Sequence, residues 1–116
     1  MNTNLSPRRL ALDLLKRSSL NVQMAAVLSD QRRTIFSWGW NHGYVHAEEH
    51  AISRANPKRL FASKITIAGR RTKSGNIVCA KPCTKDGKDC RSLIHSRNIG
   101  VIEYLDKNGN WIEERP

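Results

Sequence analysis

The sequence lacks any long hydrophobic run, and nothing in it approaches the ~20 consecutive apolar residues that span a membrane. Residues 1–9 are polar and then basic, with no apolar segment of the kind that a signal peptide carries. There are only three cysteines, an odd number. In a chain without a secretion signal, cysteines more often bind metal or do chemistry than form disulfides. We therefore expect a cytoplasmic protein with reduced thiols and no membrane partner.

Acidic residues are also scarce. The chain has 10 Asp and Glu against 20 Lys and Arg, which gives a net charge of +10. The basic residues come in pairs spread along the chain, such as Arg8-Arg9, Arg32-Arg33 and Arg70-Arg71, and form no dense tract. Such a distribution favours a basic face over a disordered tail. It indicates either a polyanionic partner, meaning nucleic acid or a phosphate-bearing ligand, or a basic surface that only aids solubility.

The length of 116 residues fits a single domain over residues 1–116. Ser6-Pro7 is a typical helix start, and Asn108-Gly109 predicts a tight hairpin turn that makes the last two strands antiparallel. Helical spacing predicts helices, and β-branched or aromatic runs predict strands. We expect helices over residues 7–18, 47–55 and 90–99, and strands over residues 21–28, 34–40, 64–69, 101–105 and 111–113. This order predicts an α/β fold, a mixed five-stranded sheet with helices packed on its faces.

Three residues have the chemistry of a catalytic zinc site, which takes three protein ligands and leaves a fourth position for water. His46 precedes one predicted helix, while Cys83 and Cys90 lie before or at the start of the next one. Helix beginnings favour the thiolates that zinc binds. Glu48 is the candidate proton carrier, provided that His46 lies at the helix start, outside regular helical dihedrals.

These residues resemble the motifs of the cytidine deaminase-like superfamily of zinc deaminases. The similarity rests on His46-Ala47-Glu48 followed by Pro82-Cys83 and a later cysteine, a signature of zinc deaminases. The upstream segment Gly39-Trp40-Asn41 is similar to the Gly-x-Asn segment that ends the second strand in these enzymes. The order of helices and strands matches too, so the resemblance covers nearly the whole chain and implies a cytidine deaminase-like α/β sandwich.

The resemblance also implies roles for individual residues. His46, Cys83 and Cys90 would hold Zn²⁺, and Glu48 would carry protons from water to the ring and to the departing ammonia. The backbone around Ala47 would hold the base, and Asn41 would contact the sugar. The family usually has two residues between its cysteines, whereas six separate Cys83 from Cys90 here. A polar loop that contains glycine would return Cys90 to the helix start.

The substrate is less defined. The final hairpin is similar to the branch of the superfamily that acts on cytosine, so we expect a cytosine-containing nucleoside, nucleotide or single-stranded nucleic acid. Trp40 and Tyr44 flank the loop before the histidine and either stack on a base or belong to the core. Trp38 is expected in the core. Small members of the family often form homo-oligomers, and we expect the same here.

Three alternatives use the same residues differently. His46-Ala47-Glu48-Glu49-His50 also matches the H-x-x-E-H motif of zinc metalloproteases, in which His46 and His50 share the metal and Glu49 is the base. A closed structural zinc site would add Cys79 as a fourth ligand. Without metal, the chain would be a basic nucleic-acid-binding module. In the deaminase interpretation, Cys79 is instead a small buried residue.

Overall fold

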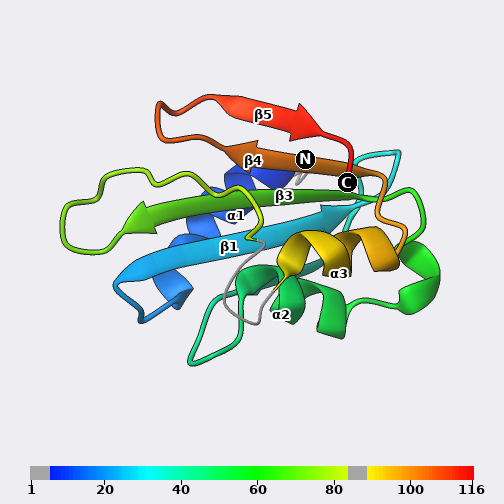
Figure 1. Ribbon diagram of the computed structural model, residues 1–116, viewed down its shortest axis with the longest axis horizontal. Helices are drawn as coiled ribbons and strands as arrows, with labels where there is room; N and C mark the ends of the chain where they lie inside the picture. The colour runs from blue at the N-terminus through cyan, green and yellow to red at the C-terminus, as the bar shows by residue number, and fades with distance from the viewer. Residues whose placement is uncertain (1–5, 84–88) are drawn as a thin grey trace, which may run out of the picture.

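The computed structural model describes residues 6–83 and 89–116. It has an α/β fold in three layers, with α1 on one face of a five-stranded sheet and with α2 and α3 on the other (Figure 1). The elements in chain order are α1 (Pro7–Leu14), the 3₁₀ turn η1 (Leu15–Arg17), β1 (Val22–Ser29), β2 (Ile35–Trp40), α2 (Ala47–Arg54), the 3₁₀ turn η2 (Pro57–Arg59), β3 (Lys64–Arg71), α3 (Cys90–Ser96), β4 (Val101–Leu105) and β5 (Trp111–Glu114). Every predicted helix and strand is confirmed in type and order.

The sheet is mixed, as expected. Its strand order is β2-β1-β3-β4-β5, and the only parallel pair is β3 with β4, which α3 connects. The hairpin of β4 and β5 is antiparallel. Gly109 in its turn has a φ of 85°, a conformation that glycine adopts without strain. Both β2 and β3 run antiparallel to β1, and β4 runs parallel to β3. The three strands β2, β3 and β4 therefore share one direction, opposite to that of β1. The segments that follow β2 and β3 therefore leave the sheet at the same end.

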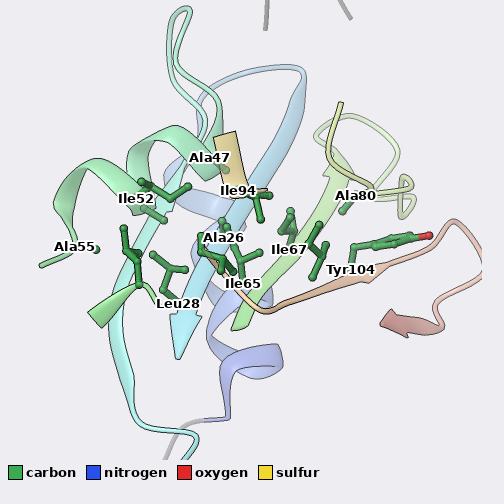
Figure 2. Close-up of a cluster of buried hydrophobic side chains, with 14 residues drawn as sticks. Ala26, Leu28, Ala47, Ile52, Ala55, Ile65, Ile67, Ala80, Ile94 and Tyr104 are labelled. Atoms are coloured by element: carbon green, nitrogen blue, oxygen red, sulfur yellow. The ribbon is translucent and has the colours of Figure 1, made fainter. Parts of the chain in front are cut away.

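Each face of the sheet buries its own apolar cluster. The cluster beneath α2 and α3 includes Leu28, Ile65, Ile67 and Ile94, all fully buried (Figure 2). The cluster beneath α1 is smaller and centres on Leu15 and Val27. Since strand residues alternate between faces, β1 contributes to both clusters. Burial of these side chains fixes where the helices begin relative to the sheet.

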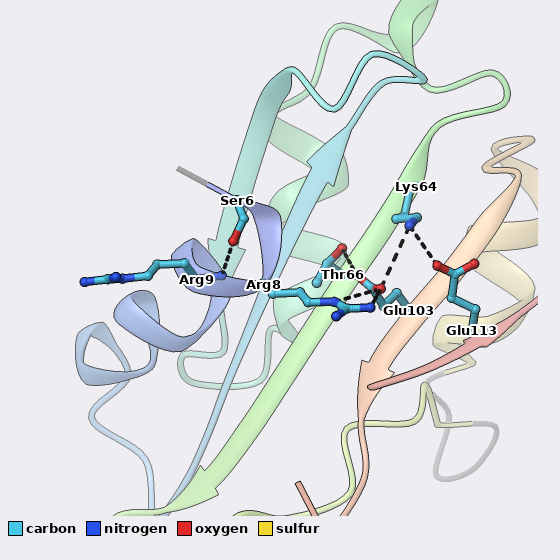
Figure 3. A network of polar contacts seen from close by, with 7 residues as sticks. All are labelled: Ser6, Arg8, Arg9, Lys64, Thr66, Glu103 and Glu113. Carbon is cyan, nitrogen blue, oxygen red and sulfur yellow. Dashed lines mark hydrogen bonds and ion pairs between the residues drawn. The ribbon is translucent and has the colours of Figure 1, made fainter. Parts of the chain in front are cut away.

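A buried carboxylate joins α1 to the sheet (Figure 3). Glu103 of β4 is 3% exposed and accepts hydrogen bonds from the Arg8 guanidinium at 2.6 and 3.0 Å. It also accepts the Thr66 hydroxyl at 3.1 Å, and the Lys64 ammonium lies 3.9 Å away. A buried charge is tolerated when it is paired and hydrogen-bonded in this way. Arg8, one of the many cations of the chain, therefore has a structural partner.

Two expectations were wrong. Trp38 is 37% exposed and does not lie in the core: it is on β2, an edge strand of the sheet, where the Arg54 guanidinium rather than apolar side chains lies over its ring. Cys79 is exposed and does not act as a small buried residue. The apolar run around it forms no strand and makes one isolated bridge, between Arg70 and Ile77. In the described part of the chain, no helix has the length and apolarity to cross a membrane.

Candidate metal centre

His46, Cys83 and Cys90 converge on one point where α2 and α3 begin. His46 Nδ1 lies 3.2 Å from Cys90 Sγ and 3.5 Å from Cys83 Sγ, and the two sulfur atoms are 3.7 Å apart. Among the residues that the structure describes, this is the group of three or more His, Cys, Asp and Glu side chains able to hold a metal ion. The sequence prediction that these three residues come together is confirmed.

The spacing of the three atoms fits a tetrahedral zinc ion. Zinc binds thiolate sulfur at about 2.3 Å and imidazole nitrogen at about 2.0–2.1 Å, so tetrahedral angles place two sulfurs about 3.8 Å apart and a sulfur and a nitrogen about 3.6 Å apart. The observed separations lie within a few tenths of an ångström of these values, from 3.2 to 3.7 Å. One histidine and two cysteines leave the fourth position for another ligand. That is the pattern of a catalytic zinc site.

His46 holds its place because it is the N-cap of α2. Its φ of −79° and ψ of 156° are extended and not helical, as the sequence argument required. Its backbone N–H donates to Glu49 Oε1 at 3.0 Å, the interaction that a glutamate makes three residues after an N-cap. Glu49, which the metalloprotease interpretation made a base, therefore fixes the helix start. The His-x-x-Glu spacing was the sequence signal for this role, and the motif analysis missed it.

Cys90 is the first residue of α3, and Asp89 caps that helix. The Asp89 carboxylate accepts from the Ser92 backbone N–H at 2.9 Å and from the Ser92 hydroxyl at 2.7 Å. The backbone N–H of Arg91 donates to the Cys83 carbonyl at 3.4 Å, which joins the two cysteine segments directly. The loop by which the chain passes from Cys83 to the helix, residues 84–88, lies outside the described residues. The cap nevertheless explains why Cys90 faces Cys83.

Glu48 is buried beside this group, 5% exposed. Burial raises the pKa of its carboxyl to about 7, the neighbouring Glu49 charge acts in the same direction, and a hydrogen bond with the Cys90 thiol opposes the rise. A carboxyl with a pKa near neutrality both accepts and donates protons at working pH. Burial also raises the pKa of the Cys90 thiol, and the Glu48 charge adds to that rise. A bound cation acts in the opposite sense, because a coordinating thiol loses its proton.

His50 points away from the metal-binding group. Its Nδ1 lies 3.2 Å from the Trp40 backbone nitrogen and 3.3 Å from the Trp40 carbonyl oxygen, so it accepts from the N–H in one tautomer and donates to the carbonyl in the other. Its ring makes edge contacts with the rings of Trp40 and His42, at centroid distances of 4.8 and 4.7 Å. Burial lowers the pKa of His50, with further contributions from the His42 and Arg54 charges. The H-x-x-E-H motif is thus present in the sequence without its geometry.

The residues predicted to bind substrate have different surroundings. Ala47 is fully buried at the first position of α2, next to His46. The Asn41 side chain extends the strand pairing of β1, because its Nδ2 donates to the Val22 carbonyl at 2.7 Å and its Oδ1 accepts from the Met24 N–H at 2.8 Å. An amide group has one further donor and one further acceptor site, so a sugar contact stays a prediction.

Trp40 is half-buried, and its ring packs against the cluster beneath α1. The guanidinium groups of Arg17 and Arg54 lie 5.3 and 5.7 Å from its ring centroid. Contact of Trp40 with a substrate base stays a prediction. Cys79 is not a member of the metal-binding group, so the closed four-ligand site has no support.

A cavity of about 1030 Å³ lies elsewhere, at the opposite end of the sheet. Its lining includes Arg8, Asp30, Lys64 and Glu103, but none of the three candidate ligands. Three of these residues belong to the structural network of Figure 3. The cavity is therefore separate from the candidate metal centre.

Comparison with known proteins adds support for the fold. No protein-family model matches the chain, and no curated protein matches it. Among solved structures, RibD of Acinetobacter baumannii in form 1 is similar, with a TM-score of 0.68, 16% identity and coverage of 86% of this chain. Form 2 of the same protein gives a TM-score of 0.67 at 16% identity over 85% of the chain. The chain spans 27% of the length of either RibD structure. The likeness is thus one of fold, over most of this chain and about a quarter of RibD.

Proposed function

We propose that this chain is a zinc-dependent deaminase that hydrolyses cytosine to uracil in a nucleoside, nucleotide or single-stranded nucleic acid. The observation that carries the proposal is the buried Glu48 carboxyl beside the His46, Cys83 and Cys90 group. Three soft ligands and one adjacent proton carrier are the requirements of this reaction. The RibD-like fold and the motif resemblance to cytidine deaminases support the same conclusion.

The residues fit zinc by donor type and spacing, and His46, Cys83 and Cys90 would hold it. Bound zinc supplies Lewis acidity, which makes a water molecule nucleophilic near neutral pH. Glu48 accepts the proton of that water and delivers it to the ring nitrogen next to the amino-bearing carbon. Once the hydroxyl group has added to that carbon, Glu48 takes the remaining hydroxyl proton and passes it to the departing amino group, which leaves as ammonia. The carbon–nitrogen bond is replaced by a carbon–oxygen bond, and the electron count is unchanged.

Burial gives the Glu48 carboxyl a pKa that suits it to proton transfer. A fully solvated carboxylate has a pKa near 4 and is a poor proton donor at neutral pH. A pKa of about 7 allows the same group to take a proton and give it back. Glu48 follows His46 by two residues, and the extended conformation of His46 places both side chains on the same side of the helix start. A hydrogen bond between Glu48 and Cys90 connects the carboxyl to the ligand group.

The alternatives have less support. A structural zinc site needs a fourth protein ligand, and Cys79 does not supply it. The metalloprotease motif needs His50, whose Nδ1 hydrogen-bonds to the Trp40 backbone of β2.

The test is an assay of uracil and ammonia release by the purified, zinc-loaded protein. Cytidine, deoxycytidine, dCMP, and cytosine-containing single-stranded DNA and RNA are offered in parallel. We expect release from at least one of them. One tightly held zinc per chain without release from any substrate would contradict the proposal and favour a structural site.

A further inference from the structure

The exposed edge of the sheet carries a row of aromatic rings with arginines over them. Trp38 and Trp40 lie two residues apart on the same face of β2, and no described strand pairs with the outer edge of β2. The Arg54 guanidinium lies 5.5 Å from the Trp38 ring centroid and 5.7 Å from that of Trp40. Arg17 of η1 lies 5.3 Å from the Trp40 centroid. These contacts hold two cations in fixed places along the strand edge.

Neither of these arginines has a carboxylate partner in the described part of the chain. The opposite edge of the sheet differs. There, Glu113 of β5 pairs with Lys64, and Glu114 pairs with Lys81 and Arg91. The cations at β5 therefore have carboxylate partners, whereas Arg17 and Arg54 at β2 have none among the described residues. A guanidinium that stacks on a ring still presents its N–H groups at its rim, where a phosphate can accept them.

The row continues towards the metal-binding group through the loop after β2. Tyr44 is 92% exposed, and it lies two residues before His46. It occupies a tight turn, in which the backbones of His42 and Val45 exchange hydrogen bonds of 2.8 and 3.1 Å. The His42 ring contacts that of His50, which contacts that of Trp40. A ring on a hydrogen-bonded turn, open to solvent, suits stacking on a flat ligand.

We infer that this surface, made of Arg17, Trp38, Trp40, Arg54 and Tyr44, binds single-stranded nucleic acid and leads one base to the metal-binding group. Arg17 and Arg54 bind phosphates, Tyr44 stacks on a base next to the reacting one, and the exposed side of Trp38 contacts a base further along. Unpaired bases are required, because a base within a duplex does not expose its face. Charge complementarity selects the polyanion, since neither arginine has a carboxylate partner among the described residues. The delivery of a base rests on the proposed deaminase function, whereas the binding of the strand does not.

The test measures binding apart from chemistry. A fluorescent oligothymidylate of about twenty nucleotides, longer than the sites of roughly 4–16 nucleotides of single-strand binders, contains no cytosine and cannot be deaminated. Its affinity for the full-length chain is measured by fluorescence anisotropy over a series of salt concentrations. Oligouridylate and a DNA duplex of the same length are measured alongside, to separate DNA from RNA and single from double strands.

We expect the Arg17→Ala, Arg54→Ala double variant to bind at least about tenfold more weakly. Each phosphate contact on a single strand contributes about 0.7 to the slope of log affinity against log salt, so the slope should fall by about 1.4. Arg17→Ala alone should give about half of that change, and it leaves the hydrogen bond from Arg54 to the Trp38 carbonyl intact. Tyr44→Ala should weaken binding about five- to 150-fold, the range for the loss of one stacked base. Lys107→Ala, an exposed cation in the turn before β5, is the matched control and should change affinity less than about twofold.

Wild-type affinity and salt slope in the double variant and in Tyr44→Ala would overturn the inference, as would equal affinity for the duplex. The outcome is separate from that of the proposed function. A chain that deaminates cytidine or dCMP but does not bind oligonucleotides retains the proposed function and refutes this surface. A chain that binds through these residues but deaminates nothing retains the surface and refutes the proposed function.

Discussion

Gly39 of β2 packs directly against the backbone of Ala51 in α2. A Cβ atom on Gly39 would lie 2.5 Å from the Ala51 nitrogen and 2.7 Å from the Cβ of His50. No helix can lie this close to a strand residue that has a side chain. The contact sets how near α2 approaches the sheet, and His46 is the N-cap of α2, so this backbone contact helps to place a candidate metal ligand.

Gly39→Ala should therefore destabilise the protein by about 1–3 kcal/mol, the range for overpacking a filled interior. Gly69→Ala is the matched control. A Cβ there would meet Met24 Sδ at 2.5 Å and Val78 Cγ2 at 2.8 Å, and these are side-chain atoms, the sulfur belonging to a flexible methionine. The free energies of unfolding of the two variants are compared by urea denaturation. A loss below about 1 kcal/mol in Gly39→Ala would show that α2 adjusts easily.

Substitution of each cysteine in turn distinguishes the candidate ligands Cys83 and Cys90 from Cys79. Cys83→Ser and Cys90→Ser should each abolish tight zinc binding, because each leaves two of the three ligands. Cys79→Ser should retain one zinc per chain, because Cys79 is exposed and outside the group. Zinc content is measured by elemental analysis after dialysis. A Cys79→Ser protein without zinc would revive the closed four-ligand site.

The His50→Ala variant tests the metalloprotease motif. We expect zinc content to be unchanged, since His50 Nδ1 hydrogen-bonds to the Trp40 backbone. We also expect a stability loss of about 1–3 kcal/mol, as for other half-buried backbone groups that lose their hydrogen-bond partner. Zinc content and thermal unfolding are measured on the same sample. Loss of the metal with an intact fold would favour the motif over the deaminase site.

Glu48→Gln should retain zinc and lose deamination. Glutamine keeps the size of the buried side chain and cannot carry the proton, so we expect the rate to fall by about 10²–10⁴-fold. The measurements are zinc content and uracil release with the best substrate of the panel. Activity within a few-fold of wild type would remove Glu48 from the proposed reaction.

Glu49 is expected to act through structure alone. Glu49→Ala removes the acceptor for the His46 N–H and should cost about 1 kcal/mol of stability with a weaker hold on zinc, whereas Glu49→Gln can still accept that hydrogen bond. Zinc affinity is measured by competition with a chelator. If Glu49→Gln lost activity while holding zinc as tightly as the wild type, Glu49 would have a chemical role.

The fold was largely predictable because its signals are local. Ser6-Pro7 started α1, Asn108-Gly109 made the last hairpin, and the periodicity of each segment matched its element. The convergence of the three candidate metal ligands was predictable because their residue types and order are distinctive. Contacts set by tertiary packing were not predictable. The hydrogen bonds of Asn41 to β1 and the place of Trp38 on an uncovered strand both depend on strand order, which no local pattern specifies.

The hydrogen bonds of Arg54 and His50 with β2 have a consequence for self-assembly. An uncovered edge strand offers its free carbonyl and N–H groups as a template for another chain. Here Arg54 donates to the Trp38 carbonyl at 3.2 Å, and His50 Nδ1 lies 3.2 Å from the Trp40 backbone nitrogen. Side chains of α2 thus occupy the polar groups that an incoming strand would need. A strand that paired along β2 would have to displace these two contacts, which disfavours the edge-to-edge pairing that begins β-aggregation.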